Sequence, residues 1–405
     1  MHVATLADRI LRVCYSPGMN AAQRMALQYV LLFGATGVSL PFAGLWLRSQ
    51  GVSAAEIGTL LAAPMLARIV TGPLLAVWAD GFRLRRTPIA ILGVVMALGY
   101  GSAGLVEGYA AWAACWFVGA TAMGVLVPLT DVMTLRLSGR LGFSFALPRG
   151  FGSAAFVGAN IAMGALLLTS ATDVVIVWLV VASLGMAAVA ILALPPEPVA
   201  DGGPVRGLER FRGMGRLLRD PVLMTAIFAV GAVQAAHAFQ YGFSAIVWKT
   251  QGISEAVTGQ LWAFGVVAEI ALMWLFEPWR RKVGIGPWSL LVVGAAAAVV
   301  RWSALAFAPP LWLLWPLQAL HALTFAATFL AGIQIVERLA PRDSQTAAQT
   351  LSSVLSAGLL IGIATAMSGA LYDRLGAGGY WAMAAMALVG LIAALPLRER
   401  LSGAQ

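Results

Sequence analysis

The sequence predicts an all-α membrane protein in which twelve transmembrane helices form two six-helix bundles. The chain is 60% hydrophobic and only 11% charged, whereas soluble domains are roughly 45–50% apolar and about 25% charged. Apolar runs of about 20 residues, the length that crosses a bilayer as a helix, recur along the chain. A segment of the first half also recurs in the second half, which indicates a duplicated bundle.

The apolar runs set the expected helices and domains. The helices are expected at about 25–47, 55–79, 87–106, 110–136, 147–170, 172–194, 221–247, 255–278, 286–308, 311–336, 346–371 and 379–397. The first six would form an N-terminal bundle (25–194) and the last six a C-terminal bundle (221–397). We expect a cytoplasmic arm at 1–24, a cytoplasmic linker at 195–220 and a cytoplasmic tail at 398–405.

The chain has a net charge of +9, and the positions of its basic residues indicate its orientation in the membrane. Most Lys and Arg residues lie in segments that would face one side of the membrane, whereas the opposite side has Arg48, Lys249 and Arg374. Because positively charged loops stay on the cytoplasmic side, both termini are expected in the cytoplasm. The basic balance is therefore not a nucleic-acid footprint, and no nucleic-acid partner is expected.

Cysteine and histidine usage predicts neither a cofactor nor an enzyme. Cys14 and Cys115 are the only cysteines, one in the arm and one in a span, so no disulfide is expected. No zinc or haem spacing occurs, and neither His237 nor His321 adjoins a Ser or Cys nucleophile. Residues 1–24 lack the apolar core of a cleavable signal peptide, so the first span should be retained.

The internal repeat is clearest before spans two and eight. Residues 50–60 read QGVSAAEIGTL and residues 251–261 read QGISEAVTGQL, at an offset of 201 residues. Chance similarity between two helix starts is the alternative, but an offset of half the chain favours duplication of a six-helix unit. The same offset superposes Arg68 on Glu269, so both side chains are expected to face the central axis.

Six ionisable side chains lie within apolar spans. Because a charge inside the bilayer costs roughly a few kcal/mol or more, such residues usually face a water-filled cavity or a partner. Three arginines, two carboxylates and one histidine can together bind an anion and move a proton, which indicates a transporter. The six are Arg68, Asp131, Arg149, Glu269, Arg301 and His321.

Asp131 and Arg149 flank the short loop between spans four and five. Their positions on adjacent antiparallel helices predict similar depths. A structural ion pair that neutralises two buried charges is one interpretation. The other is a substrate site in which Arg149 donates to an anion or hydroxyl and Asp131 orients it.

Span seven predicts a polar stripe. Gln234, His237 and Tyr241 follow at i, i+3 and i+7 on one helix face, and Trp248 continues it. A histidine on a helix is often a structural residue with satisfied hydrogen bonds. Because three polar groups share the stripe, we favour a substrate-binding face.

Glu269, Arg301 and His321 lie at the middle of spans eight, nine and ten. A structural charge network is one interpretation. The other is a proton-coupling group, because a buried carboxylate next to an arginine is subject to opposing effects that can balance near neutral pH. We expect no metal at these residues.

Asp80 lies among arginines in the string ADGFRLRR at 79–86, after span two. This string resembles the loop motif of major facilitator transporters, in which Asp and Arg join helix ends at the cytoplasmic face. EPWRRKVG at 277–284 is a degraded copy. The resemblance implies that Asp80, Arg83 and Arg85 form a gate that opens when its ion pairs break. Ordinary positive-inside charge is the alternative.

Longer strings resemble the phenylpropionate permease group of the major facilitator superfamily, and more distantly the lactose permease. The resemblance spans nearly the whole chain and is strongest in the second half. It is carried by Gln234–Trp248, Leu261–Trp262, Gly265–Glu269, Val299–Trp302, Gln318–Phe325, Leu40–Phe42, Trp46–Leu47, Ala67–Arg68 and Pro128–Asp131. The lactose permease likewise pairs an acid in span four with an arginine in span five, and has Glu, Arg and His in spans eight to ten.

Two departures from these families affect the expected mechanism. The sequence Arg-Leu-Trp-Gly-Ser of the family reads RGFGS at 149–153, so the pocket is expected to differ in shape. Lactose permeases have a second carboxylate one turn after the histidine of span ten, where this chain has Thr324. Glu269 would therefore be the proton carrier, assisted by His321.

These features together predict a proton-coupled importer of a small, phenylpropionate-like aromatic carboxylate. It would work by alternating access as a monomer in the bacterial inner membrane, with substrate, protons and the lipid bilayer as its partners. The alternatives are a sugar or nucleoside symporter, a metabolite or drug exporter and, outside transport, a membrane sensor. Aromatic residues expected to receive an apolar ring, unless they anchor the membrane interface, are Phe42, Trp46, Tyr241, Trp248, Trp262, Trp302 and Phe325.

Overall fold

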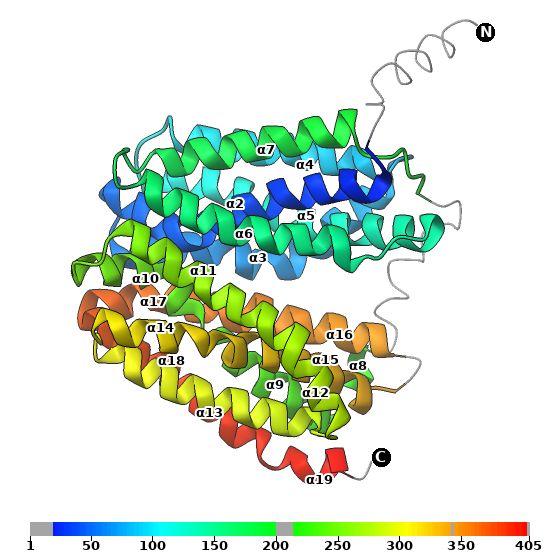
Figure 1. The fold of residues 1–405 in the computed structure, drawn as a ribbon, viewed down its shortest axis with the longest axis vertical. Coiled ribbons are helices and arrows are strands. Elements are labelled where there is room, and N and C mark those ends of the chain that lie inside the picture. The colour runs from blue at the N-terminus through cyan, green and yellow to red at the C-terminus, as the bar shows by residue number, and fades with distance from the viewer. Residues whose placement is uncertain (1–18, 200–213, 342–343, 403–405) are drawn as a thin grey trace, which may run out of the picture. The chain divides into compact units, whose positions relative to one another are not determined.

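The computed structural model describes residues 19–199, 214–341 and 344–402 (Figure 1). Most of the expected arm and linker lies outside these ranges. Within them the protein is helical, and the only β contact is an isolated bridge between Leu84 and Pro198. The all-α class predicted from the sequence is thus confirmed.

The helices follow one another with short connections, as expected for a multi-span protein. In chain order they are α2 (Ala21–Ser49), α3 (Ala54–Asp80), α4 (Arg86–Ala103), α5 (Tyr109–Leu141), α6 (Ala146–Leu166), α7 (Val174–Leu192), α8 (Met214–Leu217), α9 (Pro221–Ala235), α10 (Ala238–Thr250), α11 (Glu255–Ala271), η2 (Leu272–Phe276), α12 (Glu277–Lys282), α13 (Pro287–Ala306), α14 (Leu311–Ala319), η3 (Ala322–Ala327), α15 (Thr328–Leu339), α16 (Gln345–Ser353), η4 (Val354–Leu360), α17 (Ile361–Leu375), η5 (Gly376–Gly379), α18 (Tyr380–Ala394) and α19 (Leu397–Ser402).

Ten helical stretches of the described chain are long and apolar enough to cross a membrane. One of them, Ala347–Ala394, has 48 residues and contains the last two expected spans. The helix α6, at the fifth expected span, is not among the ten. The number of twelve spans therefore stays a prediction.

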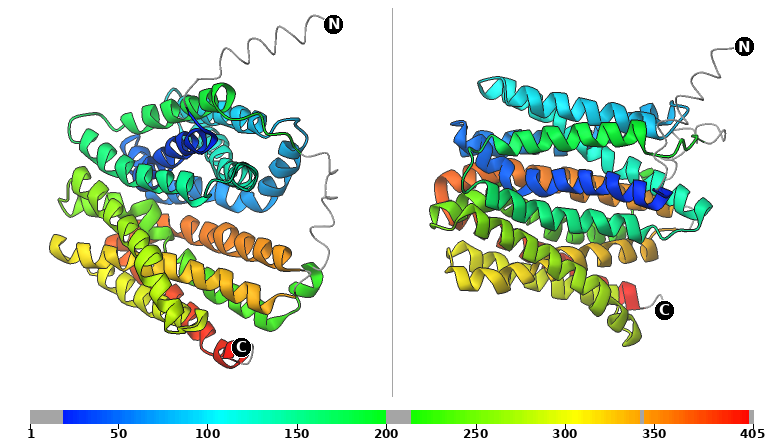
Figure 2. Two further views of the ribbon diagram at one scale, coloured as in Figure 1. Left: turned by 45° about the vertical axis from the view of Figure 1, so that its right-hand side comes forward. Right: turned by 45° about the horizontal axis from the view of Figure 1, so that its top comes forward.

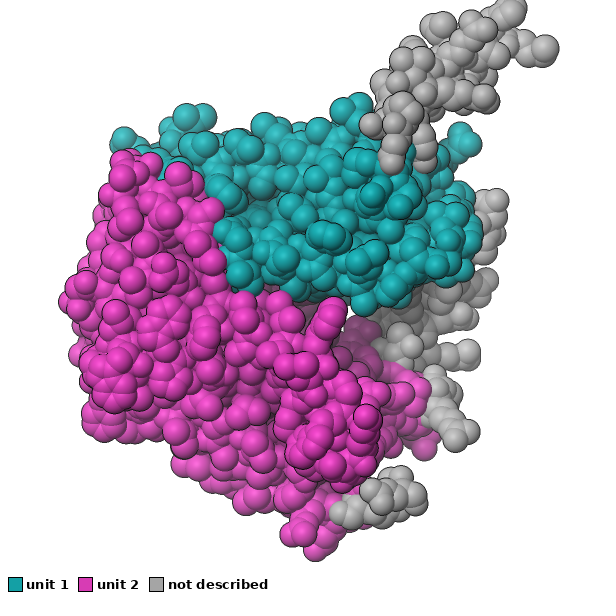
Figure 3. All heavy atoms as spheres, in the orientation of Figure 1, with its two compact units in different colours: residues 1–39, 71–159, 173–202 teal, residues 40–70, 160–172, 203–405 magenta. Residues whose placement is uncertain are grey.

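The chain divides into two compact units, coloured separately in Figure 3. Unit 1 comprises the described residues of Met1–Ser39, Thr71–Ala159 and Asp173–Gly202, and unit 2 those of Leu40–Val70, Asn160–Thr172 and Gly203–Gln405. These limits do not coincide with the expected bundles, 25–194 and 221–397, which stay a prediction.

In unit 1, α4 packs against α5 and α7, and Figure 2 shows α4 beside α7. Small residues permit these close approaches. A Cβ atom on Gly99 would come within 2.6 Å of the backbone nitrogen of Gly119, so the α4–α5 contact requires glycine. The indole of Trp178 donates to the carbonyl of Gly34 at 3.0 Å, which attaches α7 to α2.

In unit 2, α9, α13, α15 and α18 pack around a shared apolar core that includes Ala229, Leu291 and Ala331. Several expected continuous helices are interrupted here. The seventh expected span breaks at Ala236–His237, between α9 and α10, and three others contain the π-helical segments η2, η3 and η4. A π turn inserts a residue, widens the helix and is frequent at functional sites. Hydropathy does not reveal it, because the inserted residue is apolar like its neighbours.

Candidate functional site

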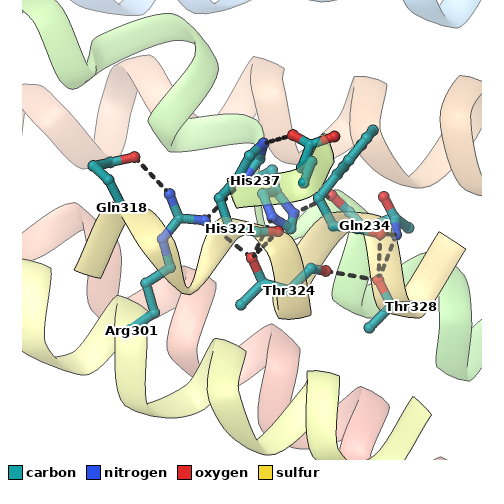
Figure 4. A network of polar contacts seen from close by, with 9 residues as sticks. Gln234, His237, Arg301, Gln318, His321, Thr324 and Thr328 are labelled. Carbon is teal, nitrogen blue, oxygen red and sulfur yellow. Dashed lines mark hydrogen bonds and ion pairs between the residues drawn. The ribbon is translucent and has the colours of Figure 1, made fainter. Parts of the chain in front are cut away.

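A buried polar network in unit 2 joins side chains from five helices (Figure 4). Gln234 and His237 lie at the break between α9 and α10, and Glu269 lies near the end of α11. Arg301 comes from α13 and Gln318 from α14. His321 immediately precedes the π-helical segment η3, which carries Thr324. The network thus gathers where span seven breaks and span ten widens.

Glu269, His321 and Arg301 form a chain of direct contacts. The Nε2 atom of His321 lies 2.9 Å from Oε1 of Glu269. The Nδ1 atom of the same ring lies 3.0 Å from Nη1 of Arg301. The imidazole therefore stands between the carboxylate and the guanidinium, which have no direct contact of their own among the described residues.

Arg301 is fully buried, with 0% of its surface exposed. Its Nη1 atom also donates to Oγ1 of Thr324 at 3.0 Å, and Nη2 donates to Oε1 of Gln318 at 2.9 Å. Its charge stacks on the ring of Trp302, 4.5 Å from the ring centroid. A guanidinium without access to solvent cannot bind substrate in this arrangement, and it acts on its neighbours instead.

Gln234 and His237 are engaged in internal hydrogen bonds. Nδ1 of His237 lies 3.0 Å from the carbonyl of Gln234, and Nε2 lies 3.0 Å from Oγ1 of Thr324. The amide nitrogen of Gln234 donates to the carbonyl of Phe325 at 3.0 Å and to Oγ1 of Thr328 at 2.5 Å. Gln234 therefore holds the widened turn of η3, whose irregular backbone leaves this carbonyl available.

The other expected residues of unit 2 occupy different surroundings. The ring of half-buried Tyr241 lies 5.7 Å from that of His237 and 5.8 Å from that of Trp262. Trp248 is buried near the end of α10. Arg68, on α3, is exposed and makes no ion pair among the described residues. The structure thus brings Tyr241 to the network, but neither Trp248 nor Arg68 contacts it.

Unit 1 holds Asp131 of α5 and Arg149 of α6 side by side. Nε of Arg149 lies 3.5 Å from Oδ1 of Asp131, and the two side chains are 32% and 29% exposed. The hydroxyl of Tyr29 donates to the same carboxylate oxygen at 2.5 Å. The guanidinium stacks over Phe33, 4.1 Å from its ring centroid.

Arg149 is the cation of this group that remains available to a ligand. The shortest contact to Asp131 is through Nε, and neither Nη1 nor Nη2 makes a hydrogen bond to a described residue. An arginine presents its two terminal nitrogens in a planar fork that matches a carboxylate. Phe33 fits beneath the guanidinium because residue 152 is glycine, where a Cβ would come within 2.9 Å of the phenyl ring.

Sequence reasoning did not identify Tyr29, Phe33 or Gln318 as site residues. Tyr29 and Phe33 are four residues apart on α2, so they lie on one helix face. That spacing was the available signal, but an aromatic pair in an apolar helix looks like ordinary core. Gln318 had a clearer signal, because an amide within an apolar span needs a partner.

The expected gate residues lie at the end of α3, where Asp80 is the last residue, and in the loop before α4. Nη1 of Arg85 is 4.0 Å from Oδ1 of Asp80. The backbone of this loop is bonded to the segment after α7, with Arg85 donating to the carbonyl of Glu197 at 2.9 Å and Val199 donating to that of Arg83 at 3.0 Å. Glu197, which the sequence did not single out, pairs with Arg140 at 2.5 Å. The gating role of Asp80, Arg83 and Arg85 stays a prediction.

No group of three or more His, Cys, Asp or Glu residues in the described chain is placed to hold a metal ion.

Comparison with known proteins yields relatives along nearly the full length. A model of the MFS_1 like family matches residues 22–383. The chain is 30% identical over 372 residues to the probable 3-phenylpropionic acid transporter of Escherichia coli (strain K12), covering 91% of this chain and 96% of that protein. It is 27% identical over 388 residues to the maltose permease of Geobacillus stearothermophilus, covering 93% and 95%.

Solved structures show a similar fold. The crystal structure of the nucleoside transporter NupG superposes with a TM-score of 0.76 at 16% identity, covering 94% of this chain and all of that one (100%). A peptide transporter POT in complex with sulfate gives a TM-score of 0.70 at 12% identity, with 95% of each chain covered.

Proposed function

The chain belongs to the MFS_1-like family of membrane transporters, and we propose that it imports a small aromatic carboxylate together with protons. It is a multi-pass integral membrane protein that acts on small molecules within a bilayer, not an enzyme. The name of the E. coli relative, a probable 3-phenylpropionic acid transporter, supports the proposed substrate class.

The half-exposed Arg149 carries the proposal for a carboxylate. Its two terminal nitrogens are unoccupied among the described residues, and Asp131 and Phe33 hold the guanidinium from its other sides. A carboxylate that approaches the fork would receive two charge-assisted hydrogen bonds. A neutral sugar hydroxyl would interact less strongly with the positive charge of Arg149, so the site favours a carboxylic acid over a glycoside.

The network in unit 2 supports proton coupling. It has one guanidinium, Arg301, and one carboxylate, Glu269, joined through His321. With Glu269 ionised and His321 neutral the network has no net charge, and protonation of Glu269 leaves a charge of +1. We propose that protonation of Glu269 and binding of the anion favour each other, so that proton and substrate load together and leave together.

We further propose the cellular setting on the basis of charge distribution and ancestry. The relatives are bacterial, and the basic segments favour cytoplasmic termini in an inner membrane. The two bundles, 25–194 and 221–397, would alternate access as a monomer.

Uptake in proteoliposomes tests the function. Labelled 3-phenylpropionate should accumulate when the lumen is alkaline, and an uncoupler that collapses the proton gradient should abolish accumulation. Accumulation that is unaffected by the uncoupler would reject coupling. Competition with maltose and a nucleoside, chosen because related proteins are named for them, separates the alternatives. Outward flux in everted vesicles would indicate an exporter, and binding without flux a sensor.

A further inference from the structure

The hydrogen bonds around Arg301 determine where the proton of each buried imidazole lies. Histidine tautomers are assigned from the groups that surround the ring. Guanidinium nitrogens can only donate. Since Nη1 of Arg301 faces Nδ1 of His321 at 3.0 Å, that nitrogen accepts. The proton of His321 is therefore on Nε2, from which it donates to Glu269 at 2.9 Å.

The ring of His237 has the opposite tautomer. Its Nδ1 atom faces the carbonyl of Gln234, which can only accept, so Nδ1 carries the proton. Its Nε2 atom then accepts from the hydroxyl of Thr324 at 3.0 Å, which is shorter than the 3.4 Å from the same hydroxyl to the carbonyl of His321. The Thr324 oxygen itself accepts from Nη1 of Arg301 at 3.0 Å. One nitrogen of Arg301 thus starts two hydrogen-bond chains, one toward Glu269 and one toward Gln234.

We propose that Thr324, oriented by His237, is a positioning residue that holds Nη1 of Arg301 against His321 and so directs the His321 proton to Glu269. This inference rests on the proposed proton coupling and extends it. The hydroxyl of Thr324 contacts both Nη1 of Arg301 and Nε2 of His237, and Figure 4 shows it beside these two side chains. Because the Thr324 hydroxyl donates to His237, its lone pairs are left to face the guanidinium.

Few charged groups surround Glu269 and His321, so the position of Arg301 controls the protonation of this pair. Glu269 and Arg301 face His321 directly. His237 is faced by His321, whose ring centroid is 5.3 Å away, and by Tyr241 at 5.7 Å. Tyr380 stacks on Trp302, beside Arg301, at 5.7 Å. If Arg301 moves away, no other cation in the network remains to disfavour protonation of the Glu269–His321 pair.

A first test needs no transport. The chain has three histidines, of which His2→Gln removes one. Solid-state ¹⁵N NMR of the histidine-labelled variant in liposomes, with His237→Asn for assignment, should show one ring protonated on Nε2 (His321) and the other on Nδ1 (His237). If His237 and His321 have the same tautomer, or if His237 is doubly protonated, the proposal is overturned.

A second test compares three substitutions in uptake of labelled 3-phenylpropionate against external pH. Thr324→Val removes the hydroxyl that Nη1 of Arg301 donates to, so Nη1 is no longer held against His321 from that side, while the bond from Nη2 to Gln318 remains. The midpoint of the pH profile should therefore shift to higher pH by about half a unit or more. The positive charge of Arg301, when next to His321, disfavours protonation of the Glu269–His321 pair, and a neighbouring charge changes such a midpoint by about this much. Thr324→Ser keeps the hydroxyl and should restore the wild-type midpoint.

Thr328→Val is the matched control. Thr328 is also a buried hydroxyl, one turn further along. It contacts the side chain of Gln234 and the backbone carbonyls of Thr324 and Phe325, but not Arg301. Its midpoint should equal that of the wild type. A Thr324→Val midpoint that equals those of Thr324→Ser and Thr328→Val would overturn the positioning role. If wild-type uptake does not depend on pH, the proposed proton coupling is wrong, and the NMR measurement of the two histidine tautomers still tests the hydrogen bonds around Arg301. The same NMR measurement tests them if the Thr324→Val protein does not fold.

Discussion

Replacing Arg149 by Lys should weaken binding of 3-phenylpropionate by roughly 30- to 1,000-fold. The ammonium retains the charge but offers the ligand one direct hydrogen bond where the guanidinium offers two. Loss of a hydrogen bond to a charged group costs about 1.5–3 kcal/mol. Lysine also loses the planar stacking on Phe33, at 4.1 Å from the ring centroid, which contributes about 0.5–1 kcal/mol. Together these losses amount to about 2–4 kcal/mol, which gives the stated range in Kd.

Isothermal titration calorimetry on purified protein measures this effect directly. Arg149→Ala should abolish detectable binding, because it removes the charge and leaves Asp131 without its cation. Arg140→Lys is the control, since Arg140 is another arginine of unit 1. It lies at the end of α5 and forms an ion pair with Glu197. An Arg149→Lys affinity within about threefold of the wild type, or an equal loss of affinity in Arg140→Lys, would exclude the proposed contact between the guanidinium and the carboxylate.

Three further substitutions test other parts of the site. Glu269→Gln should bind 3-phenylpropionate normally and exchange it across the membrane, yet fail to accumulate it against a gradient; retained accumulation would exclude Glu269 as the proton carrier. Gly152→Ala should weaken binding by about two- to fivefold, because its Cβ would meet the ring of Phe33 at 2.9 Å and displace a stacking contact that contributes about 0.5–1 kcal/mol; unchanged calorimetric affinity would count against a role of that ring. Gln234→Leu should lower stability by about 1–3 kcal/mol, since the carbonyl of Phe325 loses its buried donor; an unchanged melting temperature would contradict this.

The helical class and the positions of the charged residues could be predicted from the sequence. A long apolar helix is the structure that satisfies its own backbone in lipid, so composition alone determines that class. Charges inside such helices are costly and usually find partners, as five of the six do here, whereas Arg68 is exposed and makes no ion pair among the described residues. Asp131 and Arg149, predicted on this ground, lie 3.5 Å apart, and Glu269, Arg301 and His321 form one contact chain.

The tertiary structure alone decided which uncharged neighbours orient those charges. Tyr29 and Phe33 resemble ordinary core residues of an apolar helix, and the position of Thr324 after the histidine does not reveal its contact with Arg301. Hydropathy does not specify the rotation of one helix against another. The break before α10 and the π turn at η3 likewise arise from packing and side-chain bonds such as that from Gln234 to Phe325. The sequence thus determined which residues cannot face lipid, whereas the packing of the helices decided what each of them contacts.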